Sequence, residues 1–415
     1  MHDPAHIDLA LLAARPKAIA ALLRRFRDLD TAEEAFQEAC LRALQTWPRK
    51  GPPRDPTAWL ITVGRNAVLD AKRRDRSSDP LPADDSLLDA REDLTPERLD
   101  ESRYRDDVLR LLFVCGHPTL PATQQIALAL RIVSGLTVEQ IAKAFLVSAV
   151  AMEQRITRAK RAIADLAVEF ATPGVEERRA RLAAVSTMIY LIFNEGYGST
   201  PDTAAARRTL ADEAIRLGRL LLSLFPTDPE VFGLLALMLL QQSRADARFD
   251  ANGEIVLLDQ QDRGRWNRAL IEEGRLLLER AAAYRSPGPY QLEAAVAVLH
   301  ASAARPQDTA WKQIDSLYQI LETLQPSPVI TLNRAVAVWK LRGAAAALAM
   351  IDPLHAQLEG YFYFHALRGA LLEDLNRPAE AREALNRAIA LANSIAEANL
   401  IRRELDSLDA RRGPA

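Results

Sequence analysis

Hydrophobic residues recur at helical spacing through almost the whole chain after residue 18, and no convincing stretch shows the polar–apolar alternation of a strand. The pattern therefore predicts an all-α fold. Two stretches interrupt it. Residues 77–100 are rich in Asp, Pro and Ser and predict an acidic flexible linker, and a second break falls at Thr172–Gly174.

The segment Gly135–Arg161 predicts a helix-turn-helix. Thr137 followed by Gln140 forms a capping box, and Ser148 can cap a second helix after a short turn at Leu146–Val147. We expect one inward face on each helix, made by Val138, Ile141, Ala142 and Phe145 and then by Ala149, Met152, Ile156, Ala159 and Ile163. The opposite face of the second helix is basic. It is either a solvated surface or one that enters a major groove, and we favour the groove.

Two further helices are predicted in the first 76 residues. Thr31 with Glu34 predicts the start of one, with Phe36, Cys40, Leu44 and Trp47 buried and Glu34, Gln37, Glu38, Arg42 and Gln45 outside. Asp55 is expected to cap the next helix, with Pro56 at its first position. This helix ends in Lys72, Arg73 and Arg74. The helix dipole favours cations there, so the basic end alone does not establish DNA contact.

The formal net charge of −2 hides an uneven distribution. Residues 1–76 carry 14 Lys/Arg against 10 Asp/Glu, residues 77–107 carry 4 against 11, and residues 108–168 carry 7 against 3. Two mildly basic modules therefore flank an acidic connector. This arrangement suits two separate DNA contacts better than one continuous basic surface.

The C-terminal half contains an internal repeat of helix pairs. Small and large apolar residues recur at a shift of 34 positions, from Ala335, Val338, Ala347 and Ile351 to Gly369, Leu372, Ala381, Leu385 and Ala388. Stacked helix pairs of this kind bury a continuous core. The pattern resembles degenerate tetratricopeptide (TPR) repeats.

Other features argue against a membrane protein, a metal protein or an enzyme. No apolar run approaches the roughly 18 residues that span a bilayer, the N-terminus lacks the pattern of a secretory signal, and two lone cysteines suit a reducing cytoplasm. Asn194–Tyr197 lacks a base, a nucleophile or a metal set, and Gly196 is predicted to end a helix. Asp250–Glu254 resembles part of a calcium loop but is better interpreted as a turn, as in a short hairpin. We predict no catalytic residues, no metal and no cofactor.

Three segments together resemble the extracytoplasmic-function (ECF) group of sigma-70-type RNA polymerase sigma factors. AEEAFQEACLRALQTW resembles regions 2.1–2.2, DPTAWLITVGRNAVLDAKRRD resembles regions 2.3–2.4, and GLTVEQIAKAFLVSAVAMEQRITRAKRAI resembles region 4.2. The resemblance implies region 2 at residues 1–76, an acidic linker at 77–104 and region 4 at 105–170. Residues 171–415, which include MIYLIFNEGYGST, resemble the TPR-like helical extension of one subgroup.

The resemblance also implies partners and site residues. Core RNA polymerase would bind Glu34, Gln37, Glu38 and Arg42. The minus-ten element would meet Trp59, Arg65, Asn66, Lys72, Arg73 and Arg74, and for Trp59 we favour a packing role over stacking on a base. The minus-35 element would meet Gln154, Arg155, Arg158, Lys160 and Arg161, the last two at the phosphate backbone.

The predicted function is therefore that of a cytoplasmic sigma factor that directs promoter-specific initiation. Its extension would regulate it through an intramolecular contact or a protein partner. The alternative is a helix-turn-helix activator with a TPR-like sensor domain, which would not need the first basic module. An enzyme with an accessory helix-turn-helix is a more distant third.

Overall fold

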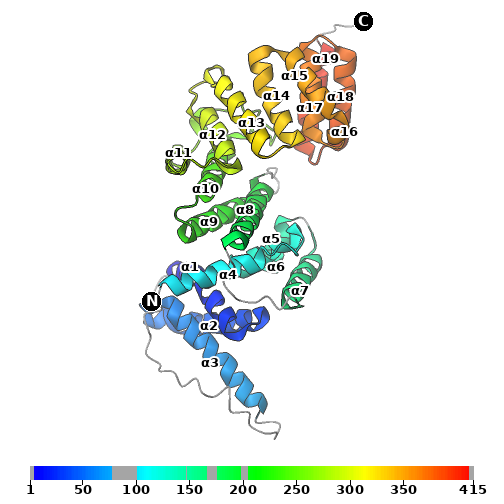
Figure 1. Ribbon diagram of the computed structural model, residues 1–415. Coiled ribbons are helices and arrows are strands. Elements are labelled where there is room, and N and C mark those ends of the chain that lie inside the picture. Colours follow the sequence, from blue (N-terminus) through cyan, green and yellow to red (C-terminus); the bar gives the residue numbers. More distant parts are fainter. Residues whose placement is uncertain (1–3, 77–100, 146, 166–174, 198–203, 411–415) are drawn as a thin grey trace. The chain divides into compact units, whose positions relative to one another are not determined.

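The computed structural model describes residues 4–76, 101–145, 147–165, 175–197 and 204–410 (Figure 1). The chain divides into two compact units, Met1–Ile192 and Phe193–Ala415. The described residues are mainly helical. Among them, Phe249 and Ile255 form an isolated antiparallel β-bridge. The predicted all-α fold is confirmed.

The N-terminal unit contains two helical groups. The first comprises α1 (Pro4–Phe26), α2 (Leu29–Lys50) and α3 (Pro56–Arg76), in which each helix packs against the other two. The second comprises α4 (Glu101–Cys115), α5 (Ala122–Ile132), α6 (Val138–Ala144) and α7 (Ala149–Asp165). Helix α8 (Val175–Tyr197) crosses the boundary between the two units in sequence.

Local capping sets where α2 and α3 begin. Asp28 caps α2 by accepting a hydrogen bond from the amide of Thr31 at 2.8 Å, so the predicted start at Thr31 and Glu34 is wrong. Asp28 follows Arg27, whose backbone is left-handed (φ 55°), and its carboxylate bonds to a free amide of the first turn. The helix therefore begins before Thr31. The predicted start of α3 is confirmed, because the side chain of Asp55 accepts from the amide of Ala58 at 3.0 Å.

Helices α2 and α3 cross very closely at Gly64. A Cβ built on this residue would lie 2.5 Å from the carbonyl oxygen of Ala35. The facing positions on α2 are small as well, since Ala32, Ala35, Ala39 and Ala43 are all buried. Small residues on both helices therefore let the two backbones approach each other.

The helix-turn-helix lies in α6 and α7. The capping box of Thr137 and Gln140 is complete, with each side chain accepting from the other residue's amide at 3.2 and 2.8 Å. Ser148 caps α7 through the amide of Ala151 at 3.2 Å. Ile141 and Ala142 are buried, as predicted, and Val138 and Phe145 are half-buried. Leu146, predicted to lie in the turn, falls outside the described residues.

The C-terminal unit is built from successive helices that pack on their neighbours (Figure 1). Its first helices are α9 (Ala204–Leu224), α10 (Pro229–Gln242), α11 (Arg268–Ala282), α12 (Pro289–Ser302) and α13 (Trp311–Leu324). They are followed by α14 (Pro328–Arg342), α15 (Ala344–Ile351), α16 (His355–Leu358), α17 (Phe362–Asp374), α18 (Pro378–Leu391) and α19 (Ile395–Ala410). Short 3₁₀ turns lie at Arg263–Arg265 (η4) and Pro306–Asp308 (η5).

The predicted helix-pair repeat matches two of these pairs. Helices α14 and α15 begin at residues 328 and 344, and α17 and α18 begin at residues 362 and 378. Every apolar position assigned to the repeat is buried. A Cβ on Gly369 would lie 2.5 Å from Leu385, which shows why the first position of the second pair is a glycine.

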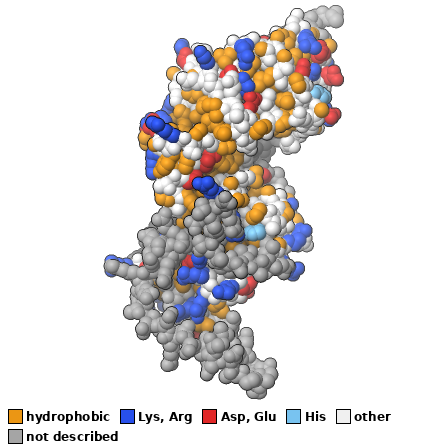
Figure 2. Space-filling model, in the orientation of Figure 1, with side chains coloured by type: hydrophobic (Ala, Val, Ile, Leu, Met, Phe, Trp, Pro, Cys, Tyr) orange, Lys and Arg blue, Asp and Glu red, His pale blue; other side chains and the backbone are white. Residues whose placement is uncertain are grey.

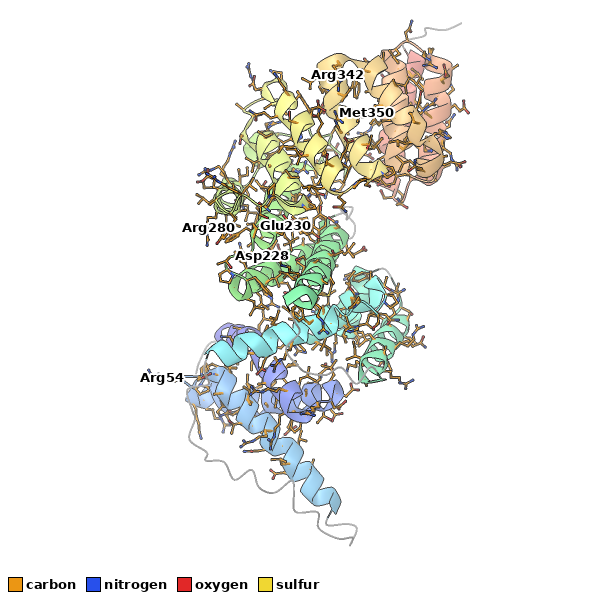
Figure 3. All side chains as sticks on the ribbon, in the orientation of Figure 1. Arg54, Asp228, Glu230, Arg280, Arg342 and Met350 are labelled. Carbon is orange, nitrogen blue, oxygen red and sulfur yellow. The ribbon has the colours of Figure 1, made fainter. Side chains whose placement is uncertain are left out.

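Two carboxylates join the early helices of this unit. Asp228 caps α10 by accepting from the amides of Glu230 and Val231 at 3.0 and 3.1 Å. Glu230 in turn accepts from the amides of Tyr290 and Gln291 at the start of α12, at 3.1 and 3.2 Å. Both carboxylates are labelled in Figure 3. A negative charge at a helix N-terminus is favoured by the free amides and by the dipole, so Glu230 holds α10 against α12.

The segment after α10 forms the predicted turn. Asp250 accepts from the amides of Asn252 and Glu254, both at 2.9 Å, and Gly253 has a positive φ of 80°. The Phe249–Ile255 bridge closes this turn, which confirms the hairpin interpretation. Among the described residues, no group of three or more His, Cys, Asp or Glu could hold a metal.

Tyr197 connects the end of α8 to this turn. Its ring stacks on Phe193 at a centroid distance of 5.3 Å, and the guanidinium of Arg248 lies 3.9 Å above it. Arg248 also donates to the carbonyl oxygen of Tyr197. Helix α8 continues through Gly196 to Tyr197, so the predicted C-cap role of this glycine is wrong. The Asn194–Tyr197 segment contributes packing to the C-terminal unit.

The close crossing at Gly64 gives a stability prediction. Gly64→Ala should destabilise the N-terminal unit by about 1–3 kcal/mol, because the new methyl group meets backbone that cannot move independently. Better helix propensity offsets about 1 kcal/mol of this at most. Amide hydrogen exchange in α2 and α3 measures the effect. Thr62→Ala, at an exposed position of the same helix, is the control and should change little. Equal exchange in both variants would contradict a tight crossing.

Candidate DNA- and polymerase-binding surfaces

Helix α7 presents a basic face opposite its buried stripe. Met152, Ile156, Ala159 and Ile163 are buried as predicted, whereas Ala149 is exposed in the first turn, contrary to prediction. The helix has only just begun at Ala149, so no neighbouring element covers it. The predicted minus-35 residues on the open side are the exposed Gln154, Arg158 and Arg161 and the half-buried Arg155. Arg158 donates to the carbonyl oxygen of Gln154 at 3.2 Å, which directs its guanidinium along the helix.

Lys160 has a different environment from the other predicted DNA contacts. Its ammonium lies 2.5 Å from Asp30 and 2.9 Å from Glu33, two carboxylates of α2, and its side chain is 17% exposed. Burial would lower the pKa of Lys160, but hydrogen bonds to these carboxylates raise this pKa above its usual value. In this arrangement Lys160 joins α7 to α2 and is not free for a phosphate.

Glu33 is the buried centre of a charge cluster, which we call the Glu33 cluster and define as Asp30, Glu33, Arg15, Arg131 and Lys160. Glu33 is only 4% exposed, and it lies 2.8 Å from Arg131, 2.9 Å from Lys160 and 4.0 Å from Arg15. These residues come from α1, α2, α5 and α7. The cluster therefore connects the first helical group of the N-terminal unit to the helix-turn-helix.

Arg15 completes the cluster through backbone contacts. Its guanidinium donates to the carbonyl oxygens of Ile132 and Arg131, both at 3.0 Å, at the end of α5. Gly135 has a positive φ of 76°, and a Cβ there would lie 2.8 Å from the Arg15 side chain. Only a glycine satisfies both the backbone conformation and the close approach.

The Glu33 cluster is not evident from the sequence. The available signal was the position of Glu33 itself, a carboxylate on the helix face that also carries Ala32 and Phe36. A carboxylate on a buried face needs cationic partners. The partners come from other helices, and Lys160 lies 127 residues away in sequence, so periodicity does not identify them.

A second surface, the α2 outer face, carries the predicted polymerase-binding residues. Glu34 and Gln37 are exposed, and Glu38 forms a 3.0 Å ion pair with Arg42 one turn away. Gln37 also donates to Glu33 at 3.3 Å, which links this face to the Glu33 cluster. The structure thus brings the four predicted residues together on one side of α2.

Two leucines lie on the same face. Leu41 is 56% exposed and Leu44 is 49% exposed. The predicted burial of Leu44 is wrong, although Phe36 and Trp47 are buried as expected and Cys40 is half-buried. The buried face of α2 instead carries the alanines that allow α1 and α3 to pack closely. Leu44 lies outside this face and is therefore exposed. Exposed leucines within a polar face are typical of a protein interface.

The predicted minus-ten residues belong to α3. The guanidinium of Arg65 donates to the side chain of Asn66 at 3.3–3.4 Å, and both residues are half-buried. Trp59 packs edge-on against Trp47 at a centroid distance of 5.3 Å, in line with a packing role. Lys72, Arg73 and Arg74 belong to the last turns of α3, and their side chains lie outside the described part of the chain.

Comparison with known proteins gives matches to both helical groups. The family Sigma-70 region 2 matches residues 11–78, and the family Sigma-70, region 4 matches residues 111–163. A family of unknown function (DUF6596) matches residues 181–282. The chain is also 61% identical over 412 residues to "Uncharacterized protein R00370" of Rhizobium meliloti (strain 1021), covering 99% of this chain and 97% of that protein.

The first two matches fall on α1–α3 and on α4–α7, the helices that form the surfaces described above. Two such regions on one chain support a factor of transcription initiation. The matches support the sigma-70 family, with regions 2 and 4 followed by a C-terminal part that includes DUF6596. No helix among the described residues is long and apolar enough to span a membrane.

Neutralising the centre of the Glu33 cluster should loosen the N-terminal unit. Glu33→Gln leaves Arg131 and Lys160 without their shared carboxylate, at a cost of about 3 kcal/mol, the low end for breaking a buried ion pair. Amide exchange should become faster in α2, α5 and α7 together. The control is Glu34→Gln, which removes the same charge from the next, exposed position. If the two variants exchange alike, the cluster does not hold these helices.

Proposed function

We propose that this protein is a sigma factor that binds core RNA polymerase and directs promoter-specific initiation, with its activity modulated by its own C-terminal unit. The observation that carries the proposal is the pair of surfaces on one chain, the α2 outer face in region 2 and the basic face of α7 in region 4. The alternative, an activator with a single helix-turn-helix, does not account for region 2.

In this proposal the α2 outer face binds the polymerase. Leu41 and Leu44 supply apolar area, and Glu34, Gln37, Glu38 and Arg42 surround it with polar groups. This combination of an apolar centre and a polar rim matches the composition of protein interfaces. The resemblance to ECF factors supports the same helix as the docking element.

The DNA contacts are assigned to α3 and α7. Arg65, Asn66 and the basic end of α3 would meet the opened minus-ten strand. Gln154, Arg155 and Arg158 would meet base edges or phosphates of the minus-35 element, with Arg161 at the backbone. Lys160 would reach a phosphate only by leaving Asp30 and Glu33. Its contribution to DNA binding is therefore coupled to opening of the Glu33 cluster.

Modulation by the C-terminal unit is supported by covalent attachment. A domain tied to the sigma regions by the same chain has an effective concentration on the order of millimolar, so even a weak contact with them is populated. The subgroup resemblance implies that this part acts in place of a separate regulator. We propose that the whole protein works in the cytoplasm and carries out no chemical reaction itself.

Run-off transcription with purified core polymerase on linear genomic fragments tests the sigma assignment. The full chain should initiate without any other sigma factor, whereas an activator should not. Leu41→Glu combined with Leu44→Glu should reduce both core binding and transcript yield at least tenfold, because two charges replace exposed apolar contacts. The matched control is Leu276→Glu with Leu324→Glu, at exposed positions of the C-terminal unit. Normal core binding by the Leu41 and Leu44 variant would remove this face from the proposal.

Truncation tests modulation. Val185 of α8 lies against Gly116, and Arg181 lies 5.9 Å from the Phe113 ring, so a chain that keeps region 4 intact should end after Tyr197. We expect its transcript yield to fall several-fold relative to the full chain, the direction that the resemblance implies. Helicity and core binding must be equal in the two proteins. Equal yields would show that the C-terminal unit does not modulate initiation.

A further inference from the structure

The C-terminal unit contains a cavity that the sigma function does not use. Its volume is about 620 Å³, and it lies among η4, η5 and helices α12, α13 and α14. This volume is within the range of pockets that hold small molecules. Figure 2 shows hydrophobic side chains gathered on the visible face of this unit.

The lining of the cavity is largely aromatic and aliphatic. Trp311, Tyr318 and Trp339 supply three aromatic side chains, and Ile314 and Val336 lie between them in sequence on α13 and α14. The ring of His300 meets Trp311 edge-on at a centroid distance of 5.4 Å. Such a lining favours a flat or bulky apolar body, because aromatic side chains offer large contact area at little entropic cost.

One wall of the cavity carries a buried cation. Arg263 is only 9% exposed, and its guanidinium donates to the carbonyl oxygens of His300 and Ala303, the latter at 2.7 Å. It also lies 4.7 Å from the Trp266 ring. In the part of the chain that the structure describes, its Nε–H has no acceptor. Carbonyl oxygens and a ring face stabilise the guanidinium without neutralising its charge.

The surrounding charges leave Arg263 uncompensated. The negative charge of Asp308 attracts the Arg263 guanidinium through space, but Asp308 already accepts hydrogen bonds of 2.9 and 3.1 Å from Arg305. Burial, with Arg244 and Arg263 nearby, lowers the pKa of His300 to about 4, so this ring is neutral near pH 7. A buried cation without a paired carboxylate favours an anion in the adjoining space.

Lys340 adds a second positive charge at the same cavity. Its ammonium lies 4.0 Å from Asp259, and both side chains are substantially exposed, at 38% and 53%. An exposed pair at this distance is weak, and a ligand anion can replace Asp259 as its partner. Positive charge therefore lies at a buried wall and at a solvent-exposed part of one cavity.

We propose that this cavity binds a small amphiphilic anion, whose aromatic body contacts Trp311, Tyr318 and Trp339 and whose acidic head group is held by Arg263 and Lys340. The C-terminal unit is then a small-molecule receptor. Binding at this cavity does not depend on the sigma activity proposed above, so the two proposals fail separately.

Titration calorimetry of the full chain with three matched probes tests the site. 2-Naphthoate and 2-naphthyl phosphate carry the aromatic body with an anionic head, and 2-naphthamide carries the same body without charge. At least one anion should bind saturably at one site and at least tenfold more tightly than the amide. The tighter of the two anions identifies the head group as carboxylate or phosphate. Equal affinity for the amide, or no saturable binding of either anion, overturns the proposal.

Two variants place the binding at this cavity. Val336→Trp fills the space and should weaken anion binding at least tenfold. Lys340→Met should weaken the anions about fivefold and leave the amide unchanged. The control for the lost charge is Arg342→Met, at the end of the same helix and outside the lining (Figure 3). Unchanged anion affinity in Val336→Trp, with wild-type helicity, would mean that the probes bind elsewhere and would overturn the assignment.

Discussion

The N-terminal unit depends on one buried carboxylate. Glu33 lies on the face of α2 that would otherwise be wholly apolar, and it is the shared partner of cations from α1, α5 and α7. Removing a carboxylate from water costs several kcal/mol unless partners surround it. The carboxylate of the first helical group is therefore paired with cations from the second group, Arg131 of α5 and Lys160 of α7. The ion pairs of Lys160 with Asp30 and Glu33 therefore join α7 to α2.

The Glu33 cluster also relates the two binding surfaces of the sigma regions. Gln37 belongs to the α2 outer face and donates to Glu33, and Lys160 belongs to α7 and pairs with it. A change at either surface therefore alters the partners available to the same carboxylate. Leu41 and Arg158 are exposed in this arrangement and take no part in the cluster.

The C-terminal unit follows a different physical rule. Its helix pairs approach closely where one position is glycine or alanine and the facing position is a larger residue, as at Gly369 and Leu385. Apolar burial then runs from pair to pair, as in α14 and α15 followed by α17 and α18. The exception is the space around Arg263, where the loop at residues 257–259 and the short turns η4 and η5 line a cavity together with α12, α13 and α14. A cavity with a buried cation arises at this irregular position.

The sequence by itself determined the features that depend on near neighbours. Helical periodicity gave the all-α fold, and the caps at Asp55, Thr137 and Ser148 lie where the sequence places them, because a cap is a bond within three residues. The buried positions of the repeat were also predictable, since small residues at a fixed spacing have few other uses. The segments that resemble sigma regions 2 and 4 coincide with the matches to those two families.

Only the tertiary structure decided which side of a helix is covered. Leu44 was expected in the core, yet the close crossing of α2 and α3 selects the alanine face and leaves this leucine exposed. Lys160 has the sequence pattern of a phosphate contact, but carboxylates 127 and 130 residues away hold it. The cavity around Arg263 likewise needs residues from five separate elements, η4, η5, α12, α13 and α14. Each depends on long-range neighbours, and a charged side chain takes its role from the charges that the fold brings to it.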